Sequence, residues 1–259
     1  MNLENPFFEI AFCVTCRNRL WQLQQTLEFN LSQLDSKQMI SLVDFGSSDG
    51  LSEWVWTNFE SYIKDNKLQF FEVKNEVRWN VSRAKNLAHR IADAKYVFNL
   101  DADNKIDKSD IQAIKNLADL NRVSHQFSGH WPDGSFGRIG LPKDFFLKIG
   151  GYDEAMLPMG GQDIDLLNRI HRLKIKIFKL PPPSLLAIQN SINDKVANIK
   201  CGELDAQRTY TMLNKTNLTL SKIRLNTEGP IKLGGFSSFL GILNGKNILI
   251  DGFDNISYL

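Results

Sequence analysis

Cysteine is scarce in this chain of 259 residues, and neither sign of charge dominates. Three cysteines are too few for the disulfide framework of a small secreted domain, so we expect a reducing compartment. The formal net charge of +2 predicts no strong attraction for nucleic acid. No run of 18 apolar residues occurs, which predicts no transmembrane helix. The short, acidic N-terminus is not typical of a signal peptide, and we expect a cytoplasmic protein.

Two of the cysteines, Cys13 and Cys16, form a C-x-x-C pair that would be compatible with redox or metal chemistry. Cys13, however, lies in an apolar segment predicted to be a strand. The remaining cysteine, Cys201, is alone, so no second pair completes a zinc site. The composition is otherwise that of an ordinary globular protein, with 42% hydrophobic and 23% charged residues.

Apolar segments alternate with helical patterns through the first hundred residues. The expected strands are 10–14, 39–44, 68–73 and 96–100. The expected helices are 20–34, 51–62 and a third that begins with Ser82 as its cap and runs to about residue 93. This order predicts an α/β fold with a mostly parallel central sheet flanked by helices.

The pattern changes after residue 103. Further helices are expected at 108–120, 143–149, 163–172 and 203–212, and short strands at 138–141 and 175–180. From about residue 214 the composition turns rich in Gly, Asn and Thr. We therefore divide the chain into a domain of residues 1–213 and a small, β-rich C-terminal extension of residues 214–259.

A pair of acidic residues, Asp101 and Asp103, follows the expected strand 96–100 directly. Ligands of open α/β sheets bind at the carboxyl ends of strands, and side chains two positions apart point to the same side. Both carboxylates can therefore face a divalent cation that carries a diphosphate. The D-x-D spacing alone is weak, because about one such pair is expected by chance. A second pair occurs at Asp163 and Asp165.

Four segments in order carry a resemblance to a known family. They are Val14-Thr15-Cys16-Arg17-Asn18-Arg19, Asn80-Val81-Ser82-Arg83-Ala84-Lys85-Asn86, Asp101-Ala102-Asp103, and Gly150-Gly151-Tyr152-Asp153 followed by Gly160-Gly161-Gln162-Asp163-Ile164-Asp165. Over about residues 8–200 the chain resembles a GT-A glycosyltransferase of the family-2 type. Its second half is similar to the β-1,4-galactosyltransferases. The resemblance implies the nucleotide-diphospho-sugar transferase fold.

The resemblance implies a nucleotide site made by Thr15, Arg17, Arg19, Asp44, Arg83 and Asp101. Arginine agrees with this chemistry, because its planar group of donors matches a diphosphate. Arg17, Arg19, Asp44 and Arg83 also have simpler interpretations. The two loop arginines would be solvated surface residues, and Asp44 would serve the following turn. In the nucleotide site Arg83 would contact the nucleobase or brace Asp101, and in its simpler interpretation it belongs to an exposed basic turn of the helix.

The resemblance also implies a Mn²⁺ or Mg²⁺ ion held by Asp103, with Asn190 as a further ligand. Many relatives have histidine at the position of Asn190, and the galactosyltransferases have methionine at that of Ala187. An amide oxygen suits Mg²⁺ better than it suits softer cations. The metal site is therefore expected to depend mainly on Asp103 and the diphosphate.

The carboxylate of Asp163 matches the catalytic base of the family, and its simpler interpretation is a helix-capping residue. Trp131, Gly161 and Gln162 are expected on the acceptor side, where an aromatic ring can stack on a sugar. Met159 replaces the tryptophan that precedes the paired glycines in galactosyltransferases, and Gln162 replaces a glutamate. The acceptor therefore does not follow from the resemblance.

These features predict an inverting glycosyltransferase that moves a hexose (Gal, GalNAc, Glc or GlcNAc) from a UDP-sugar to a glycan. A lipid-linked bacterial surface polysaccharide is the expected kind of acceptor, which leaves peripheral association with the inner face of a membrane open. A degenerate module that binds UDP-sugar or glycan without chemistry is the alternative. A nucleotidyltransferase is less favoured, because no glycine-rich phosphate loop occurs early in the chain.

Overall fold

The computed structural model describes residues 7–74, 76, 78–131, 133–199, 204–232, 235–252 and 256–258. The strands are β1 (Phe8–Cys16), β2 (Gln38–Asp44), β3 (Leu68–Val73), β4 (Ala94–Asn99), β5 (Val123–His125), β6 (Ile139–Pro142), β7 (Ile177–Lys179), β8 (Phe239–Leu243), β9 (Lys246–Ile250) and β10 (Ile256–Tyr258). The helices are α1 (Leu20–Gln33), α2 (Leu51–Lys64), α3 (Val81–Ile91), α4 (Lys108–Ala118), α5 (Lys143–Lys148), α6 (Gln162–Arg172), α7 (Ile192–Val196) and α8 (Ala206–Thr227).

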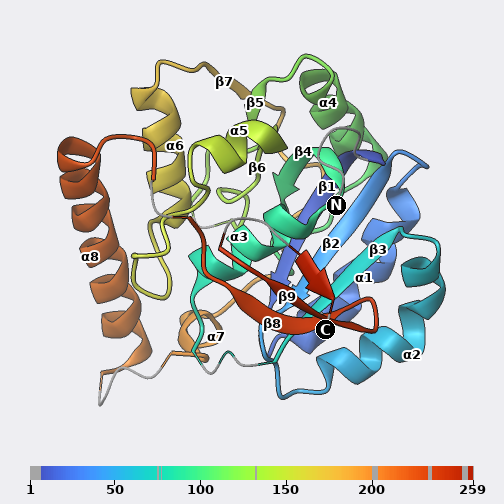
Figure 1. The fold of residues 1–259 in the computed structure, drawn as a ribbon. Coiled ribbons are helices and arrows are strands. Elements are labelled where there is room, and N and C mark those ends of the chain that lie inside the picture. The colour runs from blue at the N-terminus through green and yellow to red at the C-terminus, as the bar shows by residue number, and fades with distance from the viewer. Residues whose placement is uncertain are drawn as a thin grey trace.

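A mixed sheet runs through the molecule in the order β10-β9-β8-β3-β2-β1-β4-β6-β5-β7 (Figure 1). Its centre, from β3 through β2 and β1 to β4, is parallel, as the alternation of strands and helices predicts. The flanks differ from the expected mostly parallel sheet, because β8 pairs antiparallel with β3 and β6 pairs antiparallel with β4. The α/β fold class is confirmed, with a sheet that is mixed.

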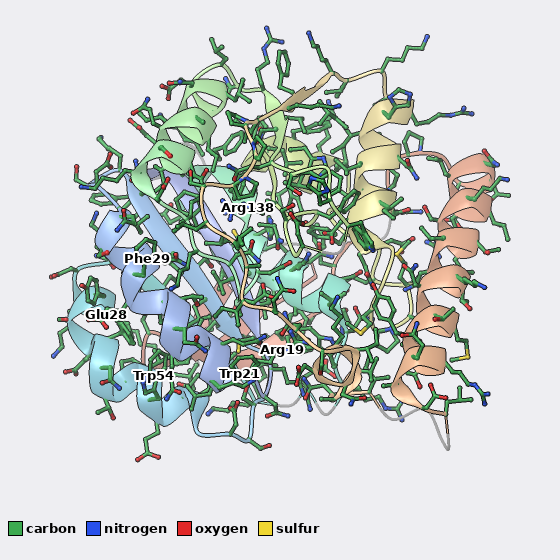
Figure 2. All side chains as sticks on the ribbon, turned by 180° about the vertical axis from the view of Figure 1, so that it is seen from behind. Arg19, Trp21, Glu28, Phe29, Trp54 and Arg138 are labelled. Atoms are coloured by element: carbon green, nitrogen blue, oxygen red, sulfur yellow. The ribbon has the colours of Figure 1, made fainter. Side chains whose placement is uncertain are left out.

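Helices cover both faces of the sheet because the central strands are apolar on both sides. Along β1, Ile10 and Phe12 pack against α1, α2 and α4, whereas Ala11 and Cys13 pack toward α3, α5 and α6. All four side chains are fully buried. Burial of a large apolar side chain contributes about 1.5–3 kcal/mol, so both layers hold the strands in place. Figure 2 shows α1 from behind, with Trp21 on its exposed side.

The parallel centre brings the ends of four strands to one edge. Cys16 at the end of β1 is paired with Asp44 at the end of β2, and Cys13 is paired with Asn99 at the end of β4. The loops that follow these strands therefore leave the sheet at the same edge. This is where open α/β sheets bind ligands.

The expected division at residues 213 and 214 falls inside a helix, and the two-part organisation of the chain stays a prediction. Helix α8 runs through this point for 22 residues, and β8 extends the same sheet beside β3. The buried carboxylate of Asp153 also binds Arg224 of α8 at 3.0 Å and Lys232 at 3.2 Å. Residues on both sides of the expected boundary thus pack against one core. Despite its length, α8 is too polar to cross a membrane, and no other described helix is suited to do so.

Three local features also differ from expectation. Helix α3 is capped by Asn80, whose side chain accepts a hydrogen bond from the backbone N–H of Arg83 at 3.1 Å, whereas Ser82 lies buried inside the first turn. Strand β5 and helix α7 were not expected at all. They have three and five residues, which is too short for hydrophobic periodicity to reveal.

The two cysteines of the C-x-x-C pair are core residues in the folded chain. Cys13 and Cys16 are both free and buried on β1, and they belong to the hydrophobic clusters on opposite faces of the sheet. Burial raises the pKa of both thiols, which keeps them protonated. The pair is therefore part of the core. Cys201 lies outside the described residues.

Candidate active site

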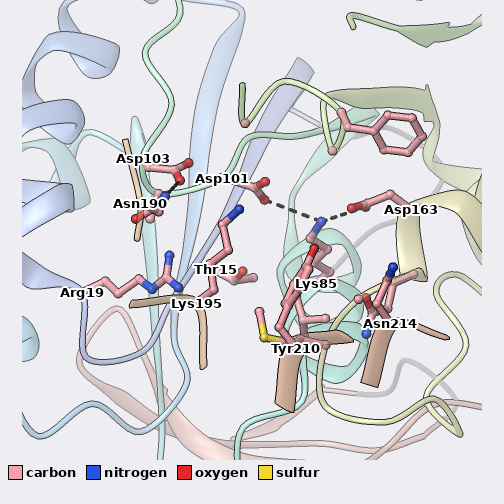
Figure 3. A pocket seen from close by; sticks show the side chains of 18 of the residues that line it. Thr15, Arg19, Lys85, Asp101, Asp103, Asp163, Asn190, Lys195, Tyr210 and Asn214 are labelled. Carbon is pink, nitrogen blue, oxygen red and sulfur yellow. Dashed lines mark hydrogen bonds and ion pairs between the residues drawn. The ribbon is translucent and has the colours of Figure 1, made fainter. Parts of the chain in front are cut away.

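A cavity of about 230 Å³ lies at the carboxyl edge of the parallel strands. Its walls come from the loops after β1 and β4, from α3, from the start of α6, from segment 188–198 and from α8 (Figure 3). Most of the residues predicted from the sequence line it together, namely Thr15, Arg17, Arg19, Asp101, Asp103, Trp131, Gly161, Gln162, Asp163 and Asn190. Parallel pairing therefore assembles positions that are far apart in the chain.

Asp101 and Asp103 lie on the turn that follows β4. The amide of Asn99 donates to Asp101 Oδ1 at 3.0 Å, and the amide of Asn104 donates to Asp103 Oδ1 at 2.6 Å. Asp103 is buried, and this burial, together with the negative charge of Asp101, raises its pKa to about 6. Two carboxylates in such proximity create a local excess of negative charge that a bound cation can offset.

Lys85 of α3 lies between the carboxylates of Asp101 and Asp163. Its Nζ is 2.8 Å from Asp163 Oδ1 and 3.6 Å from Asp101 Oδ1, with the Tyr152 ring centroid at 5.3 Å. Burial alone would lower the pKa of Lys85, but the two carboxylates outweigh that effect and raise it. The ammonium group is therefore charged and ties Asp101 and Asp163 together across the cavity (Figure 3).

Asp163 lies in the first turn of α6, on the opposite wall from Asp103 (Figure 3). The preceding Gly161 is the N-cap, and its φ of 83° is one that glycine adopts at little cost. A helix N-terminus favours a carboxylate. The nearby Asp165 is occupied elsewhere, because its side chain binds Arg169 at 2.7 Å inside the core. Of the second acidic pair, Asp163 is the one that lines the cavity.

Gly137 keeps the space between the two acidic groups open. A Cβ atom at this position would lie 3.0 Å from Asp101 Oδ2 and 3.4 Å from Asp163 Oδ2. Any larger residue would therefore fill the gap that both carboxylates face. A substrate atom held in this gap would be within reach of both groups.

The loop after β1 contributes two arginines. Arg17 donates from Nη1 to the backbone carbonyls of Phe45 at 3.0 Å and Glu76 at 3.2 Å, which fixes its guanidinium group at the cavity wall. Arg19 donates from Nη2 to the carbonyl of Asp194 at 2.8 Å. Both side chains are half-buried and line the cavity. Guanidinium groups held in this way are suited to an anionic ligand.

Asp44 and Arg83 are the two predicted nucleotide residues that do not line the cavity. Asp44 is buried, and its Oδ1 accepts a hydrogen bond from the backbone N–H of Ser47 at 2.8 Å, as a turn residue would. Burial raises its pKa. Arg83 forms an ion pair with Glu76 and donates to Ser237 Oγ at 3.1 Å. The contact with Asp101 that the sequence suggests for Arg83 is made by Lys85 instead. Nucleotide binding by Asp44 and Arg83 stays a prediction.

Asn190 reaches Asp103, the predicted metal ligand, from segment 188–198. Its amide nitrogen donates to Asp103 Oδ2, and its oxygen accepts from the amide of Gln22. The Asn190 amide would have to rotate by half a turn to offer its oxygen to a cation beside Asp103. The two carboxylates fit Mg²⁺ or Mn²⁺, which binds through one or two carboxylates together with substrate phosphates. No cluster of three His, Cys, Asp or Glu suited to a metal occurs among the described residues.

The predicted acceptor residues line the same cavity as Asp163. Trp131 is 59% exposed, and its ring centroid lies 5.0 Å from that of Phe136 in an edge-to-face arrangement. Gln162 is buried, and its amide donates to the carbonyl of Leu157 at 3.1 Å. Trp131 therefore offers a ring face to a ligand, whereas Gln162 supports the loop that leads into α6.

Two family models match this sequence. The description "Glycosyl transferase family 2" applies to residues 11–153, which include most of β1, all of β2 to β4 and both acidic residues of the first pair. The description "N-terminal domain of galactosyltransferase" applies to residues 120–192, which include Asp163 and Asn190. The first model covers more than half of the chain. This protein belongs to glycosyl transferase family 2. The resemblance seen in the sequence is thus confirmed.

Solved glycosyltransferases have a similar fold. A mannosyltransferase from Pyrobaculum calidifontis, in complex with GDP-Man and Mn²⁺, superposes with a TM-score of 0.57 at 17% identity, over 89% of this chain and 77% of its own. TarS of S. aureus, residues 1–349 in complex with UDP, gives a TM-score of 0.57 at 14% identity, over 85% of this chain and 72% of its own. The same protein in complex with UDP-GlcNAc gives a TM-score of 0.56 at 12% identity, over 85% of this chain and 73% of its own. No curated protein matches this glycosyltransferase.

Several residues that line the cavity of this glycosyltransferase were not predicted as site residues. Among them are Lys85, Gly137, Lys195, Tyr210 and Asn214. Lys85 belongs to the segment that carries the resemblance, so its position was a usable signal. Tyr210 and Asn214 had no signal, because they lie on α8, beyond both matched segments. Burial of Tyr210, together with the charge of Asp163, raises the tyrosine pKa, which keeps its hydroxyl protonated.

Helix α8 also contacts the loop that leads into α6, whose first turn holds Asp163. The fully buried amide of Asn217 donates to the carbonyls of Leu157 at 3.1 Å, Met159 at 3.1 Å and Gly160 at 2.7 Å. Its oxygen accepts from the backbone N–H of Leu157 at 2.8 Å. The two N–H groups of the Asn217 amide thus share three carbonyls, and its oxygen binds a fourth backbone group, so this side chain links α8 to residues 157–160.

Replacement of Asn217 with alanine is expected to lower the free energy of unfolding by about 2–3 kcal/mol, because buried backbone groups lose their partners. The variant Thr219→Ala on the same helix is the control. Thr219 is exposed, so its replacement should change stability by about 0.5 kcal/mol or less. Urea denaturation measures both changes, and equal losses in the two variants would contradict the role of Asn217.

Proposed function

We propose that this glycosyltransferase is an inverting enzyme that transfers a hexose from a UDP-sugar to a glycan. The sugar is Gal, GalNAc, Glc or GlcNAc. The observation that supports this proposal is the division of the cavity into two walls (Figure 3). Arg19, Asp101 and Asp103 form the wall that suits a diphosphate and its cation, and Asp163 lies on the opposite wall. In-line displacement requires the leaving group and the base on opposite sides of the anomeric carbon.

In the proposed reaction, Asp163 accepts the proton of an acceptor hydroxyl. The acceptor oxygen forms a bond to the anomeric carbon while the bond from that carbon to the diphosphate oxygen breaks, which releases UDP and inverts the configuration. Asp163 Oδ1 is bound by Lys85. Asp163 Oδ2 faces the gap at Gly137, so this oxygen is the one available to the acceptor. A base in this position typically contributes about 10²–10⁴-fold to the rate.

We include a Mn²⁺ or Mg²⁺ ion in this proposal. Asp103 would hold it, with Asp101 beside it and Asn190 as a further ligand once its amide has rotated. When bound, such an ion supplies positive charge to the departing diphosphate. Mn²⁺ is bound in the similar mannosyltransferase, which supports the proposal by fold alone. The uridine nucleotide is supported in the same way by the TarS complexes with UDP and UDP-GlcNAc.

We place the acceptor on the side of Asp163, where Figure 3 shows Tyr210 and Asn214, and we include Trp131, which lines the same cavity. Aromatic rings and an amide are suited to stack on a sugar and to bind its hydroxyl groups. We propose a glycan acceptor on this basis, with bacterial surface polysaccharide synthesis in the cytoplasm, at the inner face of the membrane, as the setting.

A screen of nucleotides and sugar nucleotides tests the proposal. UDP and one or more UDP-sugars should raise the melting temperature of the protein, more so with added Mn²⁺, because ligands that bind the folded state stabilise it. Release of UDP upon addition of a glycan acceptor should follow. Selective stabilisation by GDP would show that the proposed uridine nucleotide is wrong. Binding of UDP-sugars with no turnover of any of them would favour the binding-module alternative, which the orientation of Asn190 toward Asp103 suggests.

A further inference from the structure

Lys195 is a cation in the cavity that neither the predicted site nor the proposed reaction uses. It lies on α7, it is half-buried and it lines the cavity. Its Nζ lies 5.8 Å from the centroid of the Tyr210 ring. In the part of the chain that the structure describes, no carboxylate forms an ion pair with it. Lys85, in contrast, is already neutralised by two carboxylates.

The segment that carries Lys195, residues 188–198, is anchored to both loops at the carboxyl edge. We call it the strap. At its start, the backbone N–H of Ile188 donates to the carbonyl of Asp103 at 2.8 Å. At its end, the amide of Asn198 donates to the carbonyl of Arg17 at 2.8 Å. The strap therefore holds Lys195 at a defined position between the acidic turn and the arginine loop.

Arg19 is connected to the same strap. Its guanidinium group donates to the carbonyl of Asp194, the residue before Lys195. Figure 3 shows Arg19 and Lys195 on the same side of the cavity as Asp103, away from Asp163. Two cations from separate segments thus converge beside the acidic turn.

We propose that Arg19 and Lys195 form a phosphate site that binds the diphosphate of the donor without help from a metal ion. The inference rests on the proposed nucleotide-sugar donor and identifies which residues hold its diphosphate. Arginine supplies a planar group of donors, and lysine supplies a compact positive charge that can follow a phosphate oxygen. Both cations are side chains of the protein itself, so their binding of phosphate does not require the Asn190 amide to rotate.

The charges in the cavity explain why such a site is needed. A diphosphate carries two or more negative charges, and it must approach the carboxylates of Asp101 and Asp103. Arg19 and Lys195 offset this repulsion in the ground state. As the bond to the sugar breaks, negative charge grows on the departing phosphate, so the same cations gain importance in the transition state. A bound metal ion would add to this effect and would not replace it.

Titration calorimetry with UDP and uridine in the presence of EDTA tests this site. The wild-type protein should bind UDP at least about tenfold more tightly than uridine without metal, because charge-assisted bonds to phosphate are strong. Lys195→Met should reduce that preference about tenfold and leave the affinity for uridine unchanged. Lys195→Arg should keep most of the preference. Lys215→Met on the exposed side of α8 removes the same charge away from the cavity and should change neither affinity.

The outcomes separate this site from the proposed function. If wild-type protein binds neither UDP nor uridine, with or without Mn²⁺, the proposed uridine-nucleotide donor is wrong and the phosphate site falls with it. If wild-type protein binds UDP only when Mn²⁺ is present, the donor is supported and the metal-independent site is overturned. An unchanged preference for UDP in Lys195→Met, with an unchanged melting temperature, would also overturn the role of Lys195.

Discussion

Replacement of Asp163 with asparagine is expected to reduce sugar transfer by about 10²–10⁴-fold and to leave UDP binding intact. Asparagine has nearly the same shape, but its amide cannot accept the proton of the acceptor hydroxyl. Binding of the nucleotide should persist, because Arg19, Asp101 and Asp103 lie on the other wall of the cavity (Figure 3). The rate of UDP release at saturating donor and acceptor measures the first effect, and calorimetry with UDP measures the second.

Asp144→Asn is the matched control for this prediction. Asp144 is exposed in the first turn of α5 and does not line the cavity, so the same change of charge there should leave the transfer rate within about twofold. Asp165 is unsuitable as a control, because its buried ion pair with Arg169 supports the core. Transfer by Asp163→Asn at the wild-type rate would show that the base lies elsewhere.

Replacement of Lys85 with methionine is expected to lower both activity and stability. The ammonium group holds Asp163 Oδ1 at 2.8 Å and also offsets Asp101, so its loss leaves two carboxylates facing each other. The loss of one partner from a fully buried ion pair costs about 3–5 kcal/mol. Asp101 and Asp163 are partly hydrated, so we expect about 1–3 kcal/mol in urea denaturation. Transfer should fall by about 10²-fold or more, because the base is no longer held in place.

A double-mutant cycle distinguishes the ion pair from a simple packing role of the Lys85 side chain. In the Asp163→Asn background, one of the two carboxylates is already neutral. Lys85→Met should therefore cost about 1 kcal/mol less stability there than in the wild-type background. Equal costs in the two backgrounds would show that Lys85 is held by packing, for example against the Tyr152 ring, and not by the charge of Asp163.

The parts that could be predicted from the sequence depend on local pattern. The strands and helices from β1 to β4 follow hydrophobic periodicity, and their alternation implies parallel pairing. Parallel pairing in turn places the loops after β1 and β4 at one edge. The sequence alone therefore leads us to expect one cavity lined by Arg17, Arg19, Asp101 and Asp103, and the structure has these four residues in one cavity.

The C-terminal part could not be predicted in the same way. Helix α8 has a mixed, largely polar pattern, so its sequence does not reveal that Tyr210 and Asn214 face the cavity while Asn217 is fully buried. Nothing in the local sequence of β8 indicates that this strand pairs with β3. Long-range packing decides both, because the polar groups of α8 find their partners in loop 157–161, about 60 residues earlier.

The sequence by itself determined the α/β core and the family, and it indicated residues of the first loop, the acidic turn and the start of α6 that line one cavity. Only the tertiary structure decided which of these charged groups meet. Lys85 pairs with Asp163 and Asp101, while Asp44 and Arg83 bind within the protein, away from the cavity. The reason is physical: periodicity records which face of an element is apolar, whereas an ion pair depends on distances of a few ångströms between elements that only packing sets.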